Sequence, residues 1–416
     1  MRRLLDLPFL VILMGIAALA MLLPAAHAAV ISDLHVARSF FYAGLMFLLL
    51  TVTVGIATSN YRPRNQAGSQ LAALLGAYLI LPVVMAVPFD QAVKDTSFLN
   101  SWFEMVSSFT TTGATLYDTP GRLPPSLHLW RALVGWLGGF FVLLCAAAVL
   151  APLDLGGVEV ISGRVPGRAS KGAGQILKGA DPSERLVRHT VTLFPTYAVL
   201  TLCLWVLLLM AGENGLTALC LAMSTLSTSG ITAGESLSAS QAGVIAEVFI
   251  FFFLAFALTR RSLPGAVLTD RERTIFNDHE VQLALVFLAV VPFLLFFRHW
   301  WASLAADDVM TVSAVLHAIW GALFTTMSFL TTTGFESGDW QTARTWSGLG
   351  NPGLILLGLA MIGGGIATTA GGLKLLRVYA LTVWCIPVPS VARARPRADC
   401  ARAALMCLGS FLCSSP

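Results

Sequence analysis

Charge is scarce in this sequence. Only 12% of its 416 residues are Asp, Glu, Lys or Arg, whereas 56% are hydrophobic and the mean hydropathy is +0.77. A soluble domain carries about 25% charged residues, so this composition excludes an ordinary soluble protein. The net charge of +4 is too small to indicate binding to nucleic acid. Several apolar runs reach the roughly 20 residues that a helix needs to cross a bilayer, so we predict a polytopic membrane protein in contact with lipid.

The patterns of metal sites, disulfide frameworks and intramembrane enzymes are also missing. The seven cysteines form no CxxC pair and no zinc-type cluster with histidine. Cys145 and Cys203 lie in apolar runs, where a thiol behaves as a small hydrophobe. His279 and Glu280 are not followed by the second histidine of an HExxH motif, and no GxSG or GxGD sequence occurs. We predict no enzyme, no transition metal and no covalently bound cofactor.

The apolar runs predict eight helices, near residues 8–30, 39–58, 71–88, 129–152, 189–211, 242–259, 281–298 and from 351 onward. Basic residues follow every second run: Arg62, Arg64, Arg164, Arg168, Lys171, Lys178, Arg185, Arg188, Arg260, Arg261, Arg271, Arg273, Lys374 and Arg377. Because cytoplasmic loops are enriched in Lys and Arg, we predict a multi-pass protein of the bacterial inner membrane with a cytoplasmic N-terminus. The first run follows Arg2 and Arg3 and leads to Ala26-His27-Ala28. It is either a retained helix, which its length favours, or a cleaved signal peptide.

The alternate loops are acidic. Their acidic residues are Asp90, Asp95, Asp118, Glu213, Glu235, Asp307, Asp308, Glu336 and Asp339. These loops face outward in the predicted topology. They are either solvated loops or a vestibule that attracts cations, as acidic rings do at the mouths of cation pores.

One short pattern recurs three times in these outer loops. Residues 102–113 read WFEMVSSFTTTG, residues 219–230 read LCLAMSTLSTSG, and residues 323–334 read LFTTMSFLTTTG. Their final glycines are 117 and 104 residues apart, so each copy falls in one helix–loop–helix unit. Recurrence in a fixed place is typical of an internal repeat. A capped helix end explains any one copy, but not three on one side of the membrane.

The chemistry of this pattern suits a dehydrated cation. Non-helical backbone is tolerated inside a bilayer only where it is buried in protein or lines a water-filled cavity. An extended Thr-Thr-Gly segment there presents carbonyl oxygens, which replace the hydration shell of K⁺. Glycine permits a positive φ, and the Thr and Ser hydroxyls can bond behind the segment. The three copies of this segment consist of Thr111, Thr112, Gly113, Thr228, Ser229, Gly230, Thr332, Thr333 and Gly334.

The last apolar run, from residue 351 to about 384, is too long for one ordinary span. A stretch of small residues interrupts it: Gly363, Gly364, Gly365, Ala367, Thr368, Thr369, Gly371 and Gly372, followed by Lys374. We predict two half-helices joined by an intramembrane loop that plugs the pathway. Close helix packing of small residues is the alternative. Lys374 either contacts the pathway or extends to the cytoplasmic interface.

Taken together, FTTTGATLYD, STLSTSGITAGES, SFLTTTGFESGDW and IGGGIATTAGGLKLLR resemble the TrkH-like membrane subunit of Trk/Ktr-type bacterial potassium uptake systems. The resemblance implies an all-α fold of four helix–pore-loop–helix repeats around a central pore, after two extra N-terminal helices. It implies K⁺ coordination by the backbone of the nine residues above, and a gating loop at residues 363–374. It also implies a homodimer with a cytosolic, TrkA-like nucleotide-binding regulatory subunit.

This resemblance predicts a division of the chain into two N-terminal helices (1–60), a first repeat (61–160), a second repeat (161–262), a third repeat with the broken helix (263–384) and an atypical tail (385–416). A fourth filter glycine, at similar spacing after Gly334, would fall beyond residue 416. We expect either a truncated or frame-shifted product, or a short form whose fourth quadrant comes from a partner. The predicted function is K⁺ transport. The alternatives are a non-conducting fragment and a less selective K⁺/Na⁺ transporter.

Overall fold

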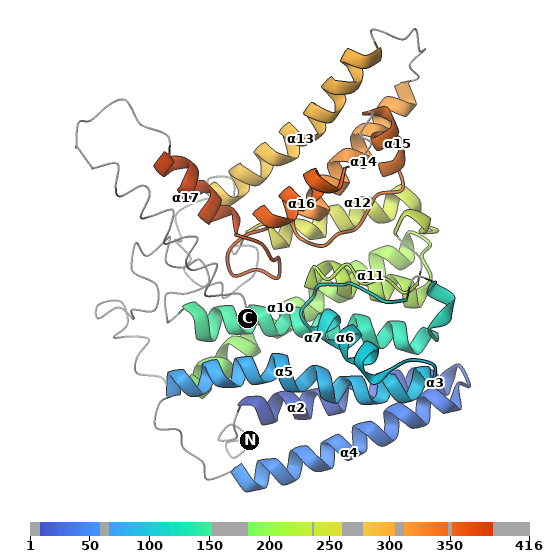
Figure 1. The fold of residues 1–416 in the computed structure, drawn as a ribbon, viewed down its shortest axis with the longest axis vertical. Coiled ribbons are helices and arrows are strands. Elements are labelled where there is room, and N and C mark those ends of the chain that lie inside the picture. Colours follow the sequence, from blue (N-terminus) through green and yellow to red (C-terminus); the bar gives the residue numbers. More distant parts are fainter. Residues whose placement is uncertain are drawn as a thin grey trace, which may run out of the picture.

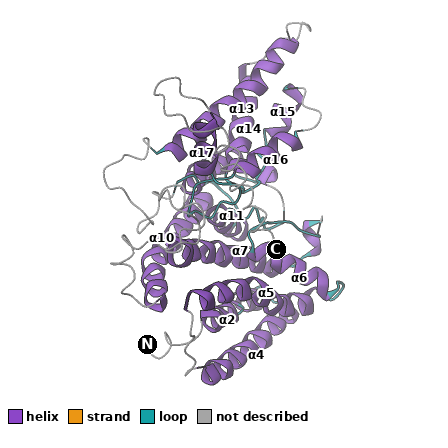
Figure 2. Ribbon diagram, turned by 60° about the vertical axis from the view of Figure 1, so that its left-hand side comes forward, coloured by secondary structure: helices purple, strands orange, loops and turns teal. Residues whose placement is uncertain are grey.

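A computed structural model describes the chain at residues 9–58, 66–117, 119–151, 182–234, 237–259, 278–303, 312–347 and 352–385. These residues form helices and loops, with no strand among them (Figure 2). Figure 1 shows the N-terminal helices (blue) at the bottom, the middle ones (green) above them and the C-terminal ones (orange and red) at the top. The predicted tail and many of the predicted loop charges lie outside the described residues: Arg62, Arg64, Asp118, Arg164, Arg168, Lys171, Lys178, Glu235, Arg260, Arg261, Arg271, Arg273, Asp307 and Asp308.

The N-terminal layer consists of α2 (Phe9–Ala20), α3 (Leu22–Val30) and α4 (Leu34–Thr58). The predicted first helix is therefore two short helices, separated by a turn residue at Met21. Both pack on α4. A Cβ on Gly44 of α4 would lie only 3.2 Å from the Ala18 carbonyl oxygen, and small residues of this kind let apolar helices approach closely.

Three units of similar order follow. The first contains α5 (Gln66–Val93), α6 (Phe98–Phe109) and α7 (Pro125–Cys145), the last continued by a π-helical turn (Ala146–Leu150). The second contains α10 (Pro182–Met210), α11 (Gly215–Ser227) and α12 (Gly243–Leu254), the last continued by a 3-10 turn (Ala255–Ala257). The third contains α13 (His279–Ser303), α14 (Val312–Leu330), α15 (Trp340–Trp346), α16 (Gly353–Ile362) and α17 (Leu375–Cys385).

Seven described helical spans are long and apolar enough to cross a membrane, when α2 and α3 are taken together as one span (Phe9–Val30). They differ in part from the predicted set. The helix predicted near residues 242–259 is only Gly243–Ala257, which is too short to be one of the seven, whereas Ser313–Leu330, which was not predicted to span, is long enough. Ser313–Leu330 belongs to α14, which ends at the third copy of the repeated pattern. It thus occupies the place of a pore helix, although apolar residues from Val312 onward make it longer than its counterparts.

Helix α7 lies at the centre of the first two units. Its span is the most buried of the seven, with 67% of its most apolar stretch buried, and it contacts α6, α10 and α11. Trp130 on this helix is fully buried and meets the ring of Phe40 edge-on at 5.4 Å. The N-terminal layer is thereby packed against the first unit. The large exposed side chains of α4 and α10 lie on the outer faces, as expected of surfaces that contact lipid.

Candidate functional site

The three copies of the pattern have the same backbone conformation. We call residues 110–113, 227–230 and 331–334 the first, second and third signature loops. Their second residues have positive φ angles: Thr111 at +57°, Thr228 at +52° and Thr332 at +58°. Their glycines do as well: Gly113 at +74°, Gly230 at +67° and Gly334 at +83°. A β-branched residue at positive φ is strained. The same strained conformation at three equivalent positions indicates that the three loops are copies of one structural repeat.

Each signature loop closes the end of its own helix in the same way. The amide before each glycine donates to a serine carbonyl five residues earlier: Thr112 to Ser107 at 2.9 Å, Ser229 to Ser224 at 3.0 Å and Thr333 to Ser328 at 2.9 Å. This is the long bond of a Schellman motif, here with threonine in the left-handed position instead of glycine. The bonds that cap each helix are therefore the same bonds that hold the signature loop in its conformation.

A hydroxyl pair stiffens each signature loop. The Oγ atoms of residues two apart lie at hydrogen-bond distance: Thr110 and Thr112 at 2.8 Å, Ser227 and Ser229 at 3.0 Å, and Thr331 and Thr333 at 3.0 Å. The side-chain hydroxyls are thus engaged with one another. The amides of the signature loops donate to the ends of their own helices. The carbonyl oxygens of the loops are therefore the backbone groups that could bind an ion.

The signature loops lie against one another in chain order. A Cβ placed on Gly113 would lie 2.0 Å from the Ser229 carbonyl oxygen, and one on Gly230 would lie 2.3 Å from the Thr333 carbonyl oxygen. A Cβ on Gly334 would meet no described atom within 4 Å. The structure therefore brings the first loop against the second and the second against the third, each glycine facing a carbonyl of the next loop.

Glycines of α7 allow this convergence. A Cβ on Gly138 would lie 2.0 Å from the Phe109 carbonyl oxygen, at the end of α6. On the next residue, Gly139, it would lie 2.7 Å from the Ser227 Cβ, at the end of α11. The backbone of α7 thus touches both helix ends. No larger residue could bring the first two signature loops so close together.

The last apolar run is broken, as the sequence predicts. After α16, residues 363–374 are not helical until α17 begins at Leu375; we call them the break segment. Its two ends lie side by side, because the amides of Leu373 and Lys374 donate to the carbonyls of Met361 and Ile362 at 2.9 and 3.0 Å. Gly363 and Gly372 both have positive φ, and a Cβ on Gly363 would lie 2.6 Å from the Gly372 Cα.

The break segment contacts the third signature loop. The Gly371 amide donates to the Thr332 Oγ1 at 2.7 Å. On its other side, the Gly365 amide donates to the Ala257 carbonyl at 3.1 Å, at the end of the second unit. The Lys374 Nζ donates to the Ala370 carbonyl. Its ammonium group therefore folds back onto the break segment, and its predicted role in the pathway stays a prediction.

Buried charged residues around the signature loops were not singled out from the sequence. Glu104 of α6 and Arg131 of α7 form an ion pair at 2.9 Å, with side chains 0% and 6% exposed. The Glu104 Oε1 also accepts from the Leu116 amide at 2.6 Å, just after the first loop. Glu280 of α13 accepts from the Ile366 amide of the break segment at 2.8 Å. The available signal was an ionisable residue inside an apolar stretch, which is rare in membranes and typical of functional regions.

Among the described residues, no group of three or more His, Cys, Asp or Glu could hold a metal ion. The residues that converge offer backbone carbonyls, hydroxyls and glycine backbone instead. Oxygen ligands without a fixed charge suit a weakly hydrated monovalent cation better than a transition metal.

Comparison with known proteins gives one consistent family. The model of a family described as "TrkH: Cation transport protein" matches residues 81–386. A Trk system potassium uptake protein of Halomonas elongata is 28% identical over 342 residues, which is 79% of this chain and 66% of the relative. An uncharacterized cation transporter of Methanocaldococcus jannaschii is 26% identical over 345 residues, 82% of this chain and 63% of the relative. The chain thus spans about two thirds of the length of these relatives.

A solved structure has the same fold. The potassium transporter TrkH of Vibrio parahaemolyticus superposes with a TM-score of 0.70 over 98% of this chain and 82% of that one, at 20% sequence identity. The agreement extends over nearly the whole chain and so includes all three helical units.

Proposed function

Because the chain belongs to the TrkH family of cation transport proteins, we propose that it forms the K⁺ pore of a Trk-type uptake system. The family consists of transporters and not of enzymes. The relatives include named potassium uptake proteins. We propose that K⁺ is also the ion that the present chain transports.

One observation carries the proposal: three signature loops with the same strained backbone lie in contact in chain order. Rings of backbone carbonyls select K⁺ because they replace its hydration shell. The proposed ligands are the carbonyl oxygens of Thr111, Thr112 and Gly113 and of their equivalents in the other two loops. The bonds that fix the loop amides and hydroxyls support such a role, since they hold the carbonyls in place before an ion arrives.

Passage of the ion is passive and gated in this proposal. With the cell interior negative, each 100 mV contributes about 2.3 kcal/mol per cation entering. The break segment is the proposed gate. While Gly371 is bonded to Thr332, the segment lies against the third signature loop and obstructs the path. Release of that bond would move the segment away and open the pore.

The remaining features of the assembly are part of the same proposal. The chain is divided into two N-terminal helices and three repeats at the boundaries given above, with the N-terminus in the cytoplasm. Two copies associate in the inner membrane, and a cytosolic nucleotide-binding subunit docks on the basic loops. Arg185 and Arg188 near the start of α10 would lie on that face. No bound cofactor is required, and K⁺ is the cargo.

Cation flux from liposomes that contain the purified chain tests this proposal. We expect K⁺ or Rb⁺ to cross faster than Na⁺ along an imposed gradient. Equal rates for K⁺ and Na⁺ would assign the less selective transport instead. The absence of any flux above that of empty liposomes, together with failure to support growth of a K⁺-auxotrophic host, would overturn the proposal.

A further inference from the structure

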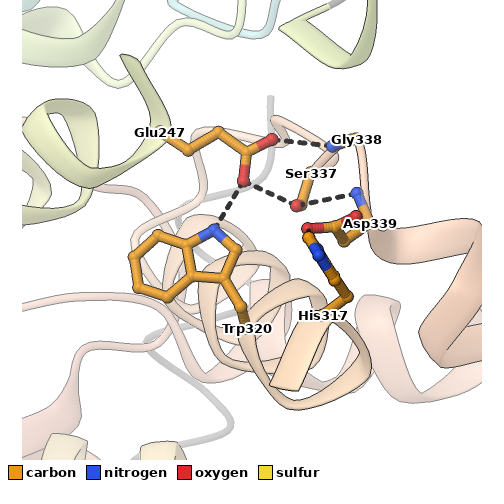
Figure 3. A network of polar contacts seen from close by, with 6 residues as sticks. All are labelled: Glu247, His317, Trp320, Ser337, Gly338 and Asp339. Carbon is orange, nitrogen blue, oxygen red and sulfur yellow. Dashed lines mark hydrogen bonds and ion pairs between the residues drawn. The ribbon is translucent and has the colours of Figure 1, made fainter. Parts of the chain in front are cut away.

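A buried carboxylate joins the second unit to the third. Glu247 lies on α12 and is only 2% exposed. Its Oε1 accepts from the Gly338 amide at 2.7 Å, and its Oε2 accepts from the Ser337 hydroxyl at 2.6 Å and from the Trp320 indole at 2.8 Å. Figure 3 shows these three donors around the one carboxylate. They come from α14 and from the segment directly after the third signature loop.

The position of this carboxylate links it to the ion pathway. Ser337 and Gly338 follow Gly334 by three and four residues, so their placement sets how the chain leaves the third signature loop. Ser337 also accepts from the Asp339 amide at 3.1 Å, which extends the network by one residue. Asp339 in turn meets His317 of α14 at 2.9 Å. The exit of the third loop is thus fixed in part from a neighbouring unit, through Glu247.

The first signature loop has a comparable anchor of different construction. Glu104 accepts from the segment after that loop, but it belongs to the same unit and its charge is matched by Arg131. Around Glu247, by contrast, the donors from described residues are an indole, a hydroxyl and an amide, all neutral. A buried carboxylate is costly without a counter-ion and persists only where hydrogen bonds compensate its desolvation.

The geometry explains why a neutral side chain would not serve. Both oxygens of Glu247 act as acceptors at once, whereas glutamine has one accepting oxygen and would present an NH₂ group to another donor. A donor facing a donor leaves a buried polar group unsatisfied. A carboxylate is therefore needed at this position because both of its oxygens accept hydrogen bonds.

We propose that Glu247 is a positioning residue for selectivity: it ties the exit of the third signature loop to α12 and so sets its spacing from the second loop. This inference rests on the proposed function, because it assigns Glu247 an effect on the discrimination between K⁺ and Na⁺. A role in folding alone would lower the amount of transporter and would reduce K⁺ and Na⁺ flux by the same factor.

The test compares Glu247→Gln with two further variants of the full chain in liposomes. Trp320→Phe removes one donor and keeps the charge, and Gln341→Ala removes an exposed side chain of α15 without touching the network. We expect Glu247→Gln to lower the K⁺/Na⁺ flux ratio by about twofold to tenfold, the range that corresponds to the net contribution of one hydrogen bond. Trp320→Phe should change the ratio in the same direction by less, and Gln341→Ala should leave it unchanged.

A second measurement does not depend on transport. Hydrogen exchange at the Gly338 amide should be faster in Glu247→Gln than in the unmodified chain, because its acceptor is weakened. An unchanged flux ratio in Glu247→Gln, or in Trp320→Phe should Glu247→Gln fail to reach the membrane, would overturn the inference. So would unchanged exchange at Gly338. Loss of all flux in the unmodified chain would instead refute the proposed function, whatever the exchange result.

Discussion

Replacement of Thr332 by valine tests whether the break segment gates the pathway. Valine has the shape of threonine and is also β-branched, so the strained backbone at this position is preserved while the acceptor of the Gly371 amide is lost. Gly371 is exposed, so its amide can turn to water and the full cost of an unsatisfied buried group does not apply. The loss is then about 0.5–1.5 kcal/mol, which shifts the equilibrium toward the released segment by about twofold to tenfold.

The assay is Rb⁺ uptake or liposome flux, in which Thr332→Val should raise the rate by up to that factor. The other signature loops provide matched controls, because Thr111 and Thr228 are also threonines with the same left-handed backbone as Thr332. The Thr228 hydroxyl donates to the neighbouring Ser227 carbonyl and not to the break segment. Were Thr332→Val no faster than Thr111→Val and Thr228→Val, the bond to Gly371 would not restrain a gate.

Three further predictions concern single residues. Gly113→Ala should abolish selective Rb⁺ uptake, because its Cβ would lie 2.0 Å from a carbonyl oxygen of the second loop. Gly334→Ala should retain more of it, because its Cβ would meet no described atom within 4 Å and only the strain of the positive φ (+83°) opposes the substitution. Arg131→Met should lower the free energy of unfolding by about 3–5 kcal/mol, since it leaves a buried carboxylate unpaired; an unchanged melting temperature in detergent would contradict this. Glu280→Ala removes the acceptor of the buried Ile366 amide, at a cost of about 1–3 kcal/mol, and should raise flux in the same assay as a loosened gate.

The repeat could be predicted from the sequence because its conformation is local. Each signature loop is set by one Schellman end, one hydroxyl pair and one glycine, all within seven residues. Those requirements restrict residue type at fixed spacing, so they are visible as a pattern. The break at residue 363 could be predicted for the same reason. The length of α14 was not predicted, because the pattern marks where a pore helix ends and not where it begins.

The anchors of the loops follow a different rule. Glu247 meets a partner 91 residues away, and Glu280 meets one 86 residues away. Such pairs depend on which helices pack together, and hydropathy does not distinguish one apolar neighbour from another. The sequence marks each position, since a carboxylate inside an apolar run needs a compensating partner, but it does not identify that partner. It also cannot separate a carboxylate matched by arginine, as at Glu104, from one held by neutral donors, as at Glu247. That difference determines what a substitution does. Loss of the Glu104 carboxylate would leave the buried charge of Arg131 unpaired, whereas loss of the Glu247 carboxylate would leave neutral donors without acceptors.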